Sequence, residues 1–155
     1  MASGDLVYQS LDAIVRPTNE NLGHGGPVAR AIAKAAGESL QWECKDFIMK
    51  YGKLGITSVM HTSAGNLSPR IKYVIHTVGP TKFHAKDDGE LFRLVKLAVF
   101  YCLNYANEHL KVRSLGIPAI SSGKFRISQQ PVLSYFYVLF LCWSIYQLEE
   151  RHGNL

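Results

Sequence analysis

This 155-residue sequence is short of cysteine and of charge, and it has no low-complexity tract, internal repeat or linker. Its three cysteines are an odd number without metal-ligand spacing, which predicts buried thiols in a reducing compartment instead of a disulfide framework. Charged residues make up 19% and hydrophobic residues 47%, which excludes a disordered chain. No basic and then apolar signal peptide opens the sequence, so we do not expect secretion. The length predicts one domain with its own core.

Acidic residues are also absent from the whole stretch between Asp46 and Asp87. Six basic residues lie within it: Lys50, Lys53, Arg70, Lys72, Lys82 and Lys86. Together with the net charge of +5, this imbalance favours anionic partners. No basic helix and no basic strand interleaved with aromatic residues accompanies it, so we expect a solvated basic face and no direct nucleic-acid binding.

One apolar run raises the question of a membrane span. Residues 131–148 carry no charge over eighteen residues, which is the length of a short span. Ser134, Ser144 and Gln147 interrupt the run and no strong positive charge flanks it, so we expect a buried C-terminal helix and no membrane insertion. An exposed apolar surface is the remaining alternative.

The rest of the chain predicts alternating strands and helices. Short runs rich in Val and Ile predict strands at 13–16, 56–61, 71–77 and 112–118. Apolar residues at helical spacing predict helices at 28–36, 39–51 and 90–108. This order is typical of an α/β fold with a parallel or mixed sheet covered by helices, which binds ligands at the carboxyl ends of its strands.

The loop after the first predicted strand carries most of the functional signal. It is dense in Asn and Gly, and it leads into a helix that Pro27 can begin and Gly37 can end. Free N–H groups at a helix N-terminus, beside glycines without a Cβ, suit a phosphate or diphosphate. An ordinary strand-to-helix turn has the same composition, so this junction alone leaves both interpretations open.

A second loop of small residues, Ser121-Ser-Gly-Lys-Phe125, follows the last predicted strand. Two loops rich in amides at neighbouring strand ends can clamp a diphosphate, and Phe125 could offer an apolar face to a sugar. A P-loop is excluded because Phe125 stands where that motif needs Ser or Thr. A dinucleotide fingerprint is disfavoured because Val28 stands in place of its third glycine.

Four motifs, in this order and spacing, resemble the macrodomain, an ADP-ribose-binding module. They are Gly4-Asp-Leu6, residues 17–26 with the Lys34-Ala-Ala-Gly37 helix end, residues 75–80 and residues 117–125. The residues of these motifs are most similar to those of macrodomains carried by poly(ADP-ribose) polymerases. The resemblance implies a three-layer α/β/α fold, a mixed sheet flanked by helices, over residues 1–125. The N-terminal end, which lacks the usual leading strand, and the apolar C-terminal segment 126–155 of the same domain are atypical.

The resemblance also implies roles for individual residues. Asp5 and the backbone of Leu6 would bind adenine, and Asn19 would hold the distal ribose or merely satisfy its own turn. If the protein is an enzyme, Asn19 and His24 would be its catalytic residues, although His24 could equally be an exposed histidine without a role. The full set of implied ligand-binding positions is Asp5, Leu6, Asn19, Gly25, Gly26, Ser121, Ser122, Gly123, Lys124 and Phe125. We expect His76 to be a core residue with its hydrogen bonds satisfied.

Three departures from the family pattern bear on activity. Arg16 replaces the first Asn of the usual Asn-Ala-Ala-Asn run, Pro27 replaces the third loop glycine, and Ala29 stands where some hydrolases carry Asp. The first expectation is therefore a reader that binds ADP-ribose, free or on mono- or poly-ADP-ribosylated proteins, without cofactor or metal, in nucleus and cytoplasm. The alternative is a weak hydrolase that removes mono-ADP-ribose from acidic side chains. A third is a poorly folding variant that acts through association.

Overall fold

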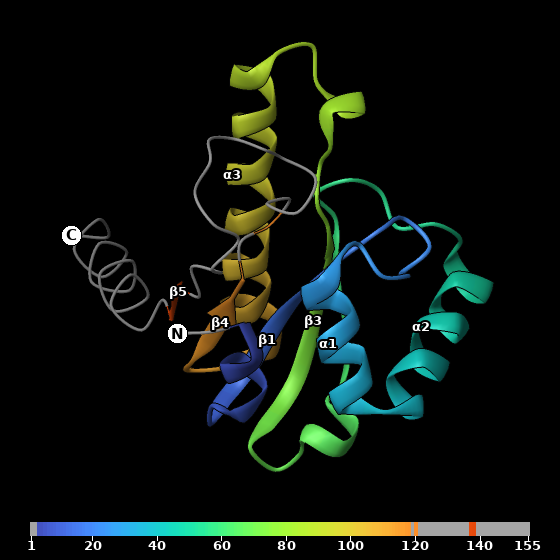
Figure 1. The fold of residues 1–155 in the computed structure, drawn as a ribbon, viewed down its shortest axis with the longest axis vertical. Helices are drawn as coiled ribbons and strands as arrows, with labels where there is room; N and C mark the ends of the chain where they lie inside the picture. Colours follow the sequence, from blue (N-terminus) through green and yellow to red (C-terminus); the bar gives the residue numbers. More distant parts are fainter. Residues whose placement is uncertain (1–2, 119, 121–136, 139–155) are drawn as a thin grey trace.

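The computed structural model describes residues 3–118, 120 and 137–138 (Figure 1). Within these residues a mixed sheet of five strands has the order β2-β3-β1-β4-β5. β1 runs parallel to β3 and β4, while β2 pairs antiparallel with β3 and β5 antiparallel with β4. The strands are β1 (Leu11–Thr18), β2 (Val59–Ser63), β3 (Ile71–Val78), β4 (Leu115–Ile117) and β5 (Tyr137–Val138).

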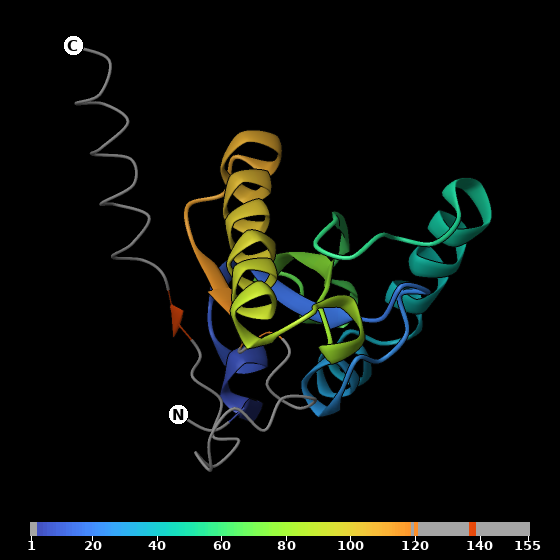
Figure 2. The ribbon, with the colours of Figure 1, turned by 90° about the horizontal axis from the view of Figure 1, so that it is seen from above.

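Helices cover both faces of this sheet, as Figures 1 and 2 show. Helices α1 (Pro27–Ala36) and α2 (Glu38–Tyr51) lie on one face and α3 (Asp88–Asn104) on the other. Alternate residues of β1 point to opposite faces, so Ile14 packs in the cluster of α1 and α2 while Val15 packs with α3. The three-layer α/β/α arrangement with a mixed sheet is therefore confirmed.

Short helices complete the described chain. The three 3-10 helices are η1 (Ser3–Tyr8), η2 (Gly65–Leu67) and η3 (Lys82–His84). The π-helix η4 (Tyr105–Leu110) continues α3, so the predicted helix at 90–108 is longer than expected at both ends. Asp87 sets the start of α3, because its carboxylate accepts a hydrogen bond of 2.7 Å from the backbone N–H of Glu90.

Two predicted strands are shorter or shifted for local reasons. Strand β2 begins at Val59 because Thr57 has a φ of 65° in a turn and donates its N–H to Val78. Strand β4 begins at Leu115 because Lys111, with a φ of 53°, and Val112 still belong to the end of the helix.

The expected helix at 131–148 lies mostly outside the described residues. Tyr137–Val138 are described, and they form β5 beside β4, so the helix prediction is wrong at these two residues. Within an apolar run, hydrophobic periodicity alone does not separate a buried strand from a buried helix, which explains the error. In the described part of the chain, no helix is long and apolar enough to cross a membrane.

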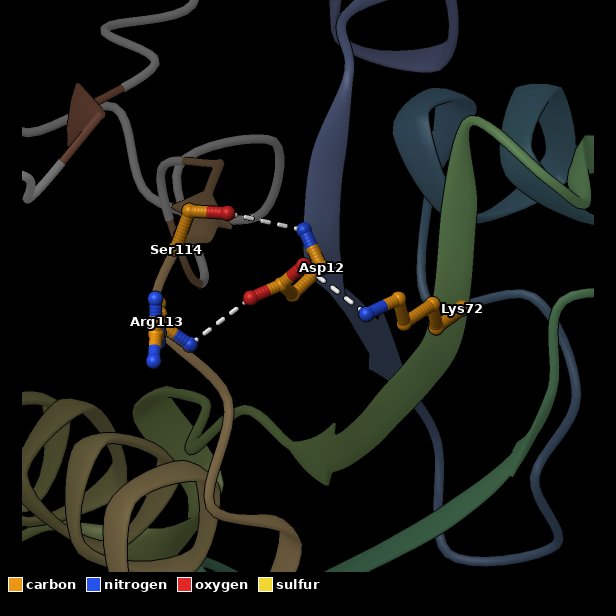
Figure 3. A network of polar contacts seen from close by, with 4 residues as sticks. All are labelled: Asp12, Lys72, Arg113 and Ser114. Carbon is orange, nitrogen blue, oxygen red and sulfur yellow. Dashed lines mark hydrogen bonds and ion pairs between the residues drawn. The ribbon is translucent and has the colours of Figure 1, made fainter.

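Asp12 ties together the amino ends of the three parallel strands (Figure 3). Its backbone N–H donates to Ser114 Oγ at 2.8 Å, and its carboxylate accepts the backbone N–H of Arg113 at 2.7 Å. Lys72 on β3 places its Nζ 3.6 Å from the same carboxylate. The carboxyl ends of β1, β3 and β4 therefore emerge together at the opposite edge.

Candidate functional site

A cleft of about 690 Å³ opens at the carboxyl ends of β1 and β3. One wall is the end of β1 and its loop, including Asn19, Glu20 and Gly25. The other is the last residue of β3 and the segment that follows it, residues 78–84. The structure therefore brings two of the sequence-predicted ligand positions, Asn19 and Gly25, into one cavity. It lies where a ligand of an open α/β sheet is expected.

Asn19 shapes the loop in which it stands. Its side-chain oxygen accepts the backbone N–H groups of Asn21 at 3.1 Å and Gly23 at 2.9 Å, and its backbone oxygen accepts that of Leu22 at 3.0 Å. The turn role considered from the sequence is thus present. Among the described residues the amide nitrogen has no hydrogen-bond partner, so it is the group with which Asn19 could donate to a sugar hydroxyl.

Gly25 and Gly26 differ in what surrounds them. A Cβ on Gly25 would lie 2.8 Å from the backbone oxygen of Pro17 and 3.1 Å from the carbonyl carbon of Thr18, so the loop can fold back onto β1 only with glycine there. A Cβ on Gly26 would meet nothing within 4 Å. Gly26 precedes Pro27 at the start of α1, so its open space adjoins the free N–H groups of that helix.

Arg16 holds this loop by hydrogen bonds from inside the core, a role that the sequence analysis missed. The side chain is fully buried in β1, although it carries a charge. Its Nε donates to the backbone oxygen of Ala29 at 3.0 Å and its Nη1 to that of Leu22 at 3.2 Å. A charged residue directly after the apolar residues 13–15 of β1 was the available signal. Arg16 links β1, the glycine loop and the first turn of α1.

The guanidinium of Arg16 also fixes two histidines. Its Nη1 lies 3.2 Å from Nδ1 of His76 and its Nη2 lies 3.1 Å from Nδ1 of His24. Because arginine only donates, both Nδ1 atoms accept, and each imidazole is neutral with its proton on Nε2. Nε2 of His76 then donates to Oγ1 of Thr62 at 2.9 Å. The expectation that His76 is a satisfied core residue is confirmed.

Burial and charge favour the same neutral state. Burial, and then the positive charge of Arg16, holds the pKa of His76 well below its ordinary value. Desolvation, followed by the charges of Arg16 and Arg30, lowers the pKa of His24. His24 is consequently arranged to donate a hydrogen bond from Nε2 and not to accept a proton.

The remaining predicted positions are only partly described. Leu6 is buried in the core, where its Cδ1 would lie 2.5 Å from a Cβ on Gly116, so η1 packs against β4. Asp5 belongs to η1, and its side chain is not described. Ser121, Ser122, Gly123, Lys124 and Phe125 lie outside the described residues, as does Cys142, whereas Cys44 and Cys102 are buried free thiols.

Ala29 does not line the cleft. It is fully buried in the first turn of α1, and its backbone oxygen accepts the Nε–H of Arg16. Glu20 is the one carboxylate among the described residues that line the cleft. No group of three or more potential metal ligands occurs in the described part of the chain.

The second wall of the cleft carries residues that the sequence analysis did not select. Lys82, Phe83 and His84 form η3 directly after Gly79-Pro-Thr81, and all three are exposed. The available signal was their place, since they follow the carboxyl end of a predicted strand.

Comparison with known families places the sequence beside proteins with this architecture. The family model described as "Macro domain" matches residues 15–136. An uncharacterized protein of Thermotoga maritima is 40% identical over 136 residues, which are 88% of this chain and 22% of that protein. Protein mono-ADP-ribosyltransferase PARP9 of Mus musculus is 32% identical over 160 residues, covering 97% of this chain and 17% of that protein. The chain thus spans about a fifth of these two relatives.

Solved structures agree with the sequence comparison. The Oceanobacillus iheyensis macrodomain with ADP superimposes with a TM-score of 0.71 at 25% identity, covering 94% of this chain and 74% of that one. The Trypanosoma brucei macrodomain in complex with ADP-ribose gives a TM-score of 0.63 at 28% identity, covering 79% of this chain and 47% of that one.

Proposed function

Because this chain belongs to the macrodomain family, we propose that it binds ADP-ribose in the cleft at the ends of β1 and β3. The observation that carries the proposal is the glycine loop held by Arg16 at the N-terminus of α1. The solved macrodomains with ADP and with ADP-ribose support it by their shared fold.

The ligand chemistry follows from the charge of this loop. The hydrogen-bond acceptors around Arg16 are backbone oxygens and imidazole nitrogens, and no carboxylate of the described residues is paired with it. A buried cation and a helix N-terminus together favour an anion above the loop. A diphosphate flanked by two sugars fits, with the distal ribose beside Asn19.

We favour a reader of ADP-ribosylation, which binds the modification on mono- or poly-ADP-ribosylated proteins and does not remove it. Ala29 supplies no carboxylate, and His24 has its proton on Nε2 and its Nδ1 engaged by Arg16. Neither is therefore placed as a general base. Nucleus and cytoplasm, where ADP-ribosylated proteins would be met, are the proposed locations.

A hydrolase is the second candidate, supported by Glu20. This carboxylate lines the cleft beside Asn19 and could activate a water near the distal ribose. A test is release of ADP-ribose from a glutamate-linked mono-ADP-ribosylated peptide. Turnover by the wild-type protein that disappears in Glu20→Gln would favour the hydrolase. Wild-type turnover equal to a buffer blank would exclude the hydrolase and leave ADP-ribose binding as the proposed function.

Calorimetric titration with ADP-ribose and AMP tests binding itself. We expect tighter binding of ADP-ribose, because AMP lacks the second phosphate and the distal ribose. Gly26→Glu should abolish binding, since it adds a bulky anion to an open space and not to the core. Gly55→Glu is the matched control, because a Cβ there meets only Ser58 Oγ at 3.4 Å, outside the cleft. Equal affinity for AMP and ADP-ribose would refute the proposal.

A further inference from the structure

The turn Thr81–His84 forms one wall of the cleft and is closed by its own hydrogen bonds. The backbone N–H of His84 donates to the oxygen of Thr81 at 2.9 Å. In return, Nδ1 of His84 accepts the backbone N–H of Thr81 at 2.9 Å and lies 3.0 Å from its Oγ1. These reciprocal bonds hold the backbone at both ends of η3, which places Lys82 and Phe83 on this wall.

Phe83 stands at the centre of this turn with its ring in solvent. Its exposed fraction is 98%, the highest among the exposed large hydrophobic residues described, yet it lines the cleft. Because this ring contacts almost no protein, a flat ligand that stacks on it would bury its apolar surface and gain the corresponding hydrophobic free energy.

A cation accompanies the ring. Lys82 is exposed and lines the same wall, and Lys86 follows on the same loop. An aromatic platform next to a lysine suits a nucleobase and its phosphate, because the base stacks while the ammonium meets the charge.

We propose that the Thr81–His84 turn is a second subsite, which binds the nucleotide unit attached to the distal ribose of the first ADP-ribose. This inference rests on the proposed function, since the first unit must occupy the Asn19 side of the cleft. Asn19 and Phe83 line one cavity, so the second subsite begins where the first ends. The protein then distinguishes chains of ADP-ribose from a single unit.

The test compares the dissociation constants of ADP-ribose and of a two-unit ADP-ribose oligomer by calorimetry. We expect the oligomer to bind about tenfold more tightly to the wild-type protein, because stacking of one base on an aromatic ring typically increases affinity by about this factor. Phe83→Ala should reduce this ratio to about one. Phe92→Ala is the matched control, because Phe92 is 60% exposed beside Lys96 on α3, away from the cleft, and it should keep the tenfold ratio.

The outcomes separate this inference from the proposed function. Wild-type binding of both ligands with equal affinity overturns the second subsite and leaves ADP-ribose binding intact, while binding of neither overturns the proposed function. A ratio that survives Phe83→Ala also overturns the subsite. A peptide carrying one ADP-ribose on glutamate is the third ligand, and a gain for it without a gain for the oligomer would assign the turn to a peptide and overturn the nucleotide proposal.

Discussion

Arg16 concentrates several functions in one side chain. It replaces the polar Asn of the family run with a longer group that reaches Leu22, Ala29, His24 and His76 from inside the core. Burying a cation is costly unless its donors are satisfied, and here four neutral acceptors surround it. The ligand loop and the core therefore share one hydrogen-bond network.

Replacing Arg16 should change both stability and histidine ionisation. In Arg16→Lys a single ammonium replaces a planar fork, so several of the four acceptors lose their donor and the free energy of unfolding should fall by about 1–3 kcal/mol. Arg16→Leu also removes the charge, so the pKa of His24 should rise toward its ordinary value. Denaturant unfolding and NMR titration of the His24 ring measure the two effects.

Arg113→Lys is the control for these variants, because its described contact to Asp12 is made by the backbone N–H and its side chain is exposed. A His24 pKa that is identical in the wild type and in Arg16→Leu would contradict the electrostatic part of this account.

At the level of elements, the two glycines of the loop between β1 and α1 differ in whether the fold requires glycine there. Gly25 is required by the close approach to Pro17, whereas Gly26 is not required by any neighbour. The backbone at Gly26, with φ 171°, is extended and open to any residue.

The paired alanine variants test this difference. Gly25→Ala should lower the free energy of unfolding by about 1–3 kcal/mol, because its Cβ meets backbone that cannot move away easily. Gly26→Ala should leave thermal stability within about 0.5 kcal/mol of the wild type. Thermal melts followed by circular dichroism measure both variants. Equal losses of stability in Gly25→Ala and Gly26→Ala would contradict the close approach of Gly25 to Pro17 as the reason for glycine at that position.

The start of α3 offers a further measurable element. Asp87→Ala removes the acceptor of the Glu90 N–H, and the loss of a helix cap typically costs about 1 kcal/mol. Asp88→Ala, one residue into the helix, retains the cap and is the comparison variant. Similar melting temperatures for the two variants would contradict the role of Asp87.

For the whole molecule, buried neutral histidine makes stability depend on pH. The pKa of His76 is lowered in the folded state, so the unfolded chain binds a proton first as the pH falls below about 6.5. The free energy of unfolding should be full above that pH and should fall below it by up to about 1.4 kcal/mol per pH unit for this one group. Denaturant melts between pH 5 and pH 8 measure the slope.

In His76→Asn an amide oxygen can still accept from Arg16, but no proton is taken up, so the slope below about pH 6.5 should become shallower. A slope identical to that of the wild type would exclude His76 as its source.

Much of the fold could be predicted because most elements are long enough to show a hydrophobic period. The strand at 71–77 and the helix at 28–36 were placed within one residue at each end. Strand β5, with two residues, and η3, with three, are too short for a period, so neither could be recognised.

The site was predicted unevenly for a different reason. The glycine loop is encoded locally, so the cleft position of Asn19 and Gly25 follows from their own segment. Arg16 and Phe83 gain their meaning from partners or exposure that only the assembled sheet creates. Ligand contacts of the predicted residues remain predictions for the binding experiments.

The Asp12 contacts give the molecule an internal reference for hydrogen exchange. Asp12 and Thr18 stand at opposite ends of β1, about 20 Å apart along an extended strand. The backbone N–H of Ala13 bonds to Ser114 and that of Leu11 to Arg70, at the end far from the cleft. A bound ligand should slow exchange in the loops after β1 and β3 by more than it slows these amides, which lie outside the cleft and follow the stability of the sheet. The ratio of the two rates therefore separates local protection by the ligand from a change in overall stability.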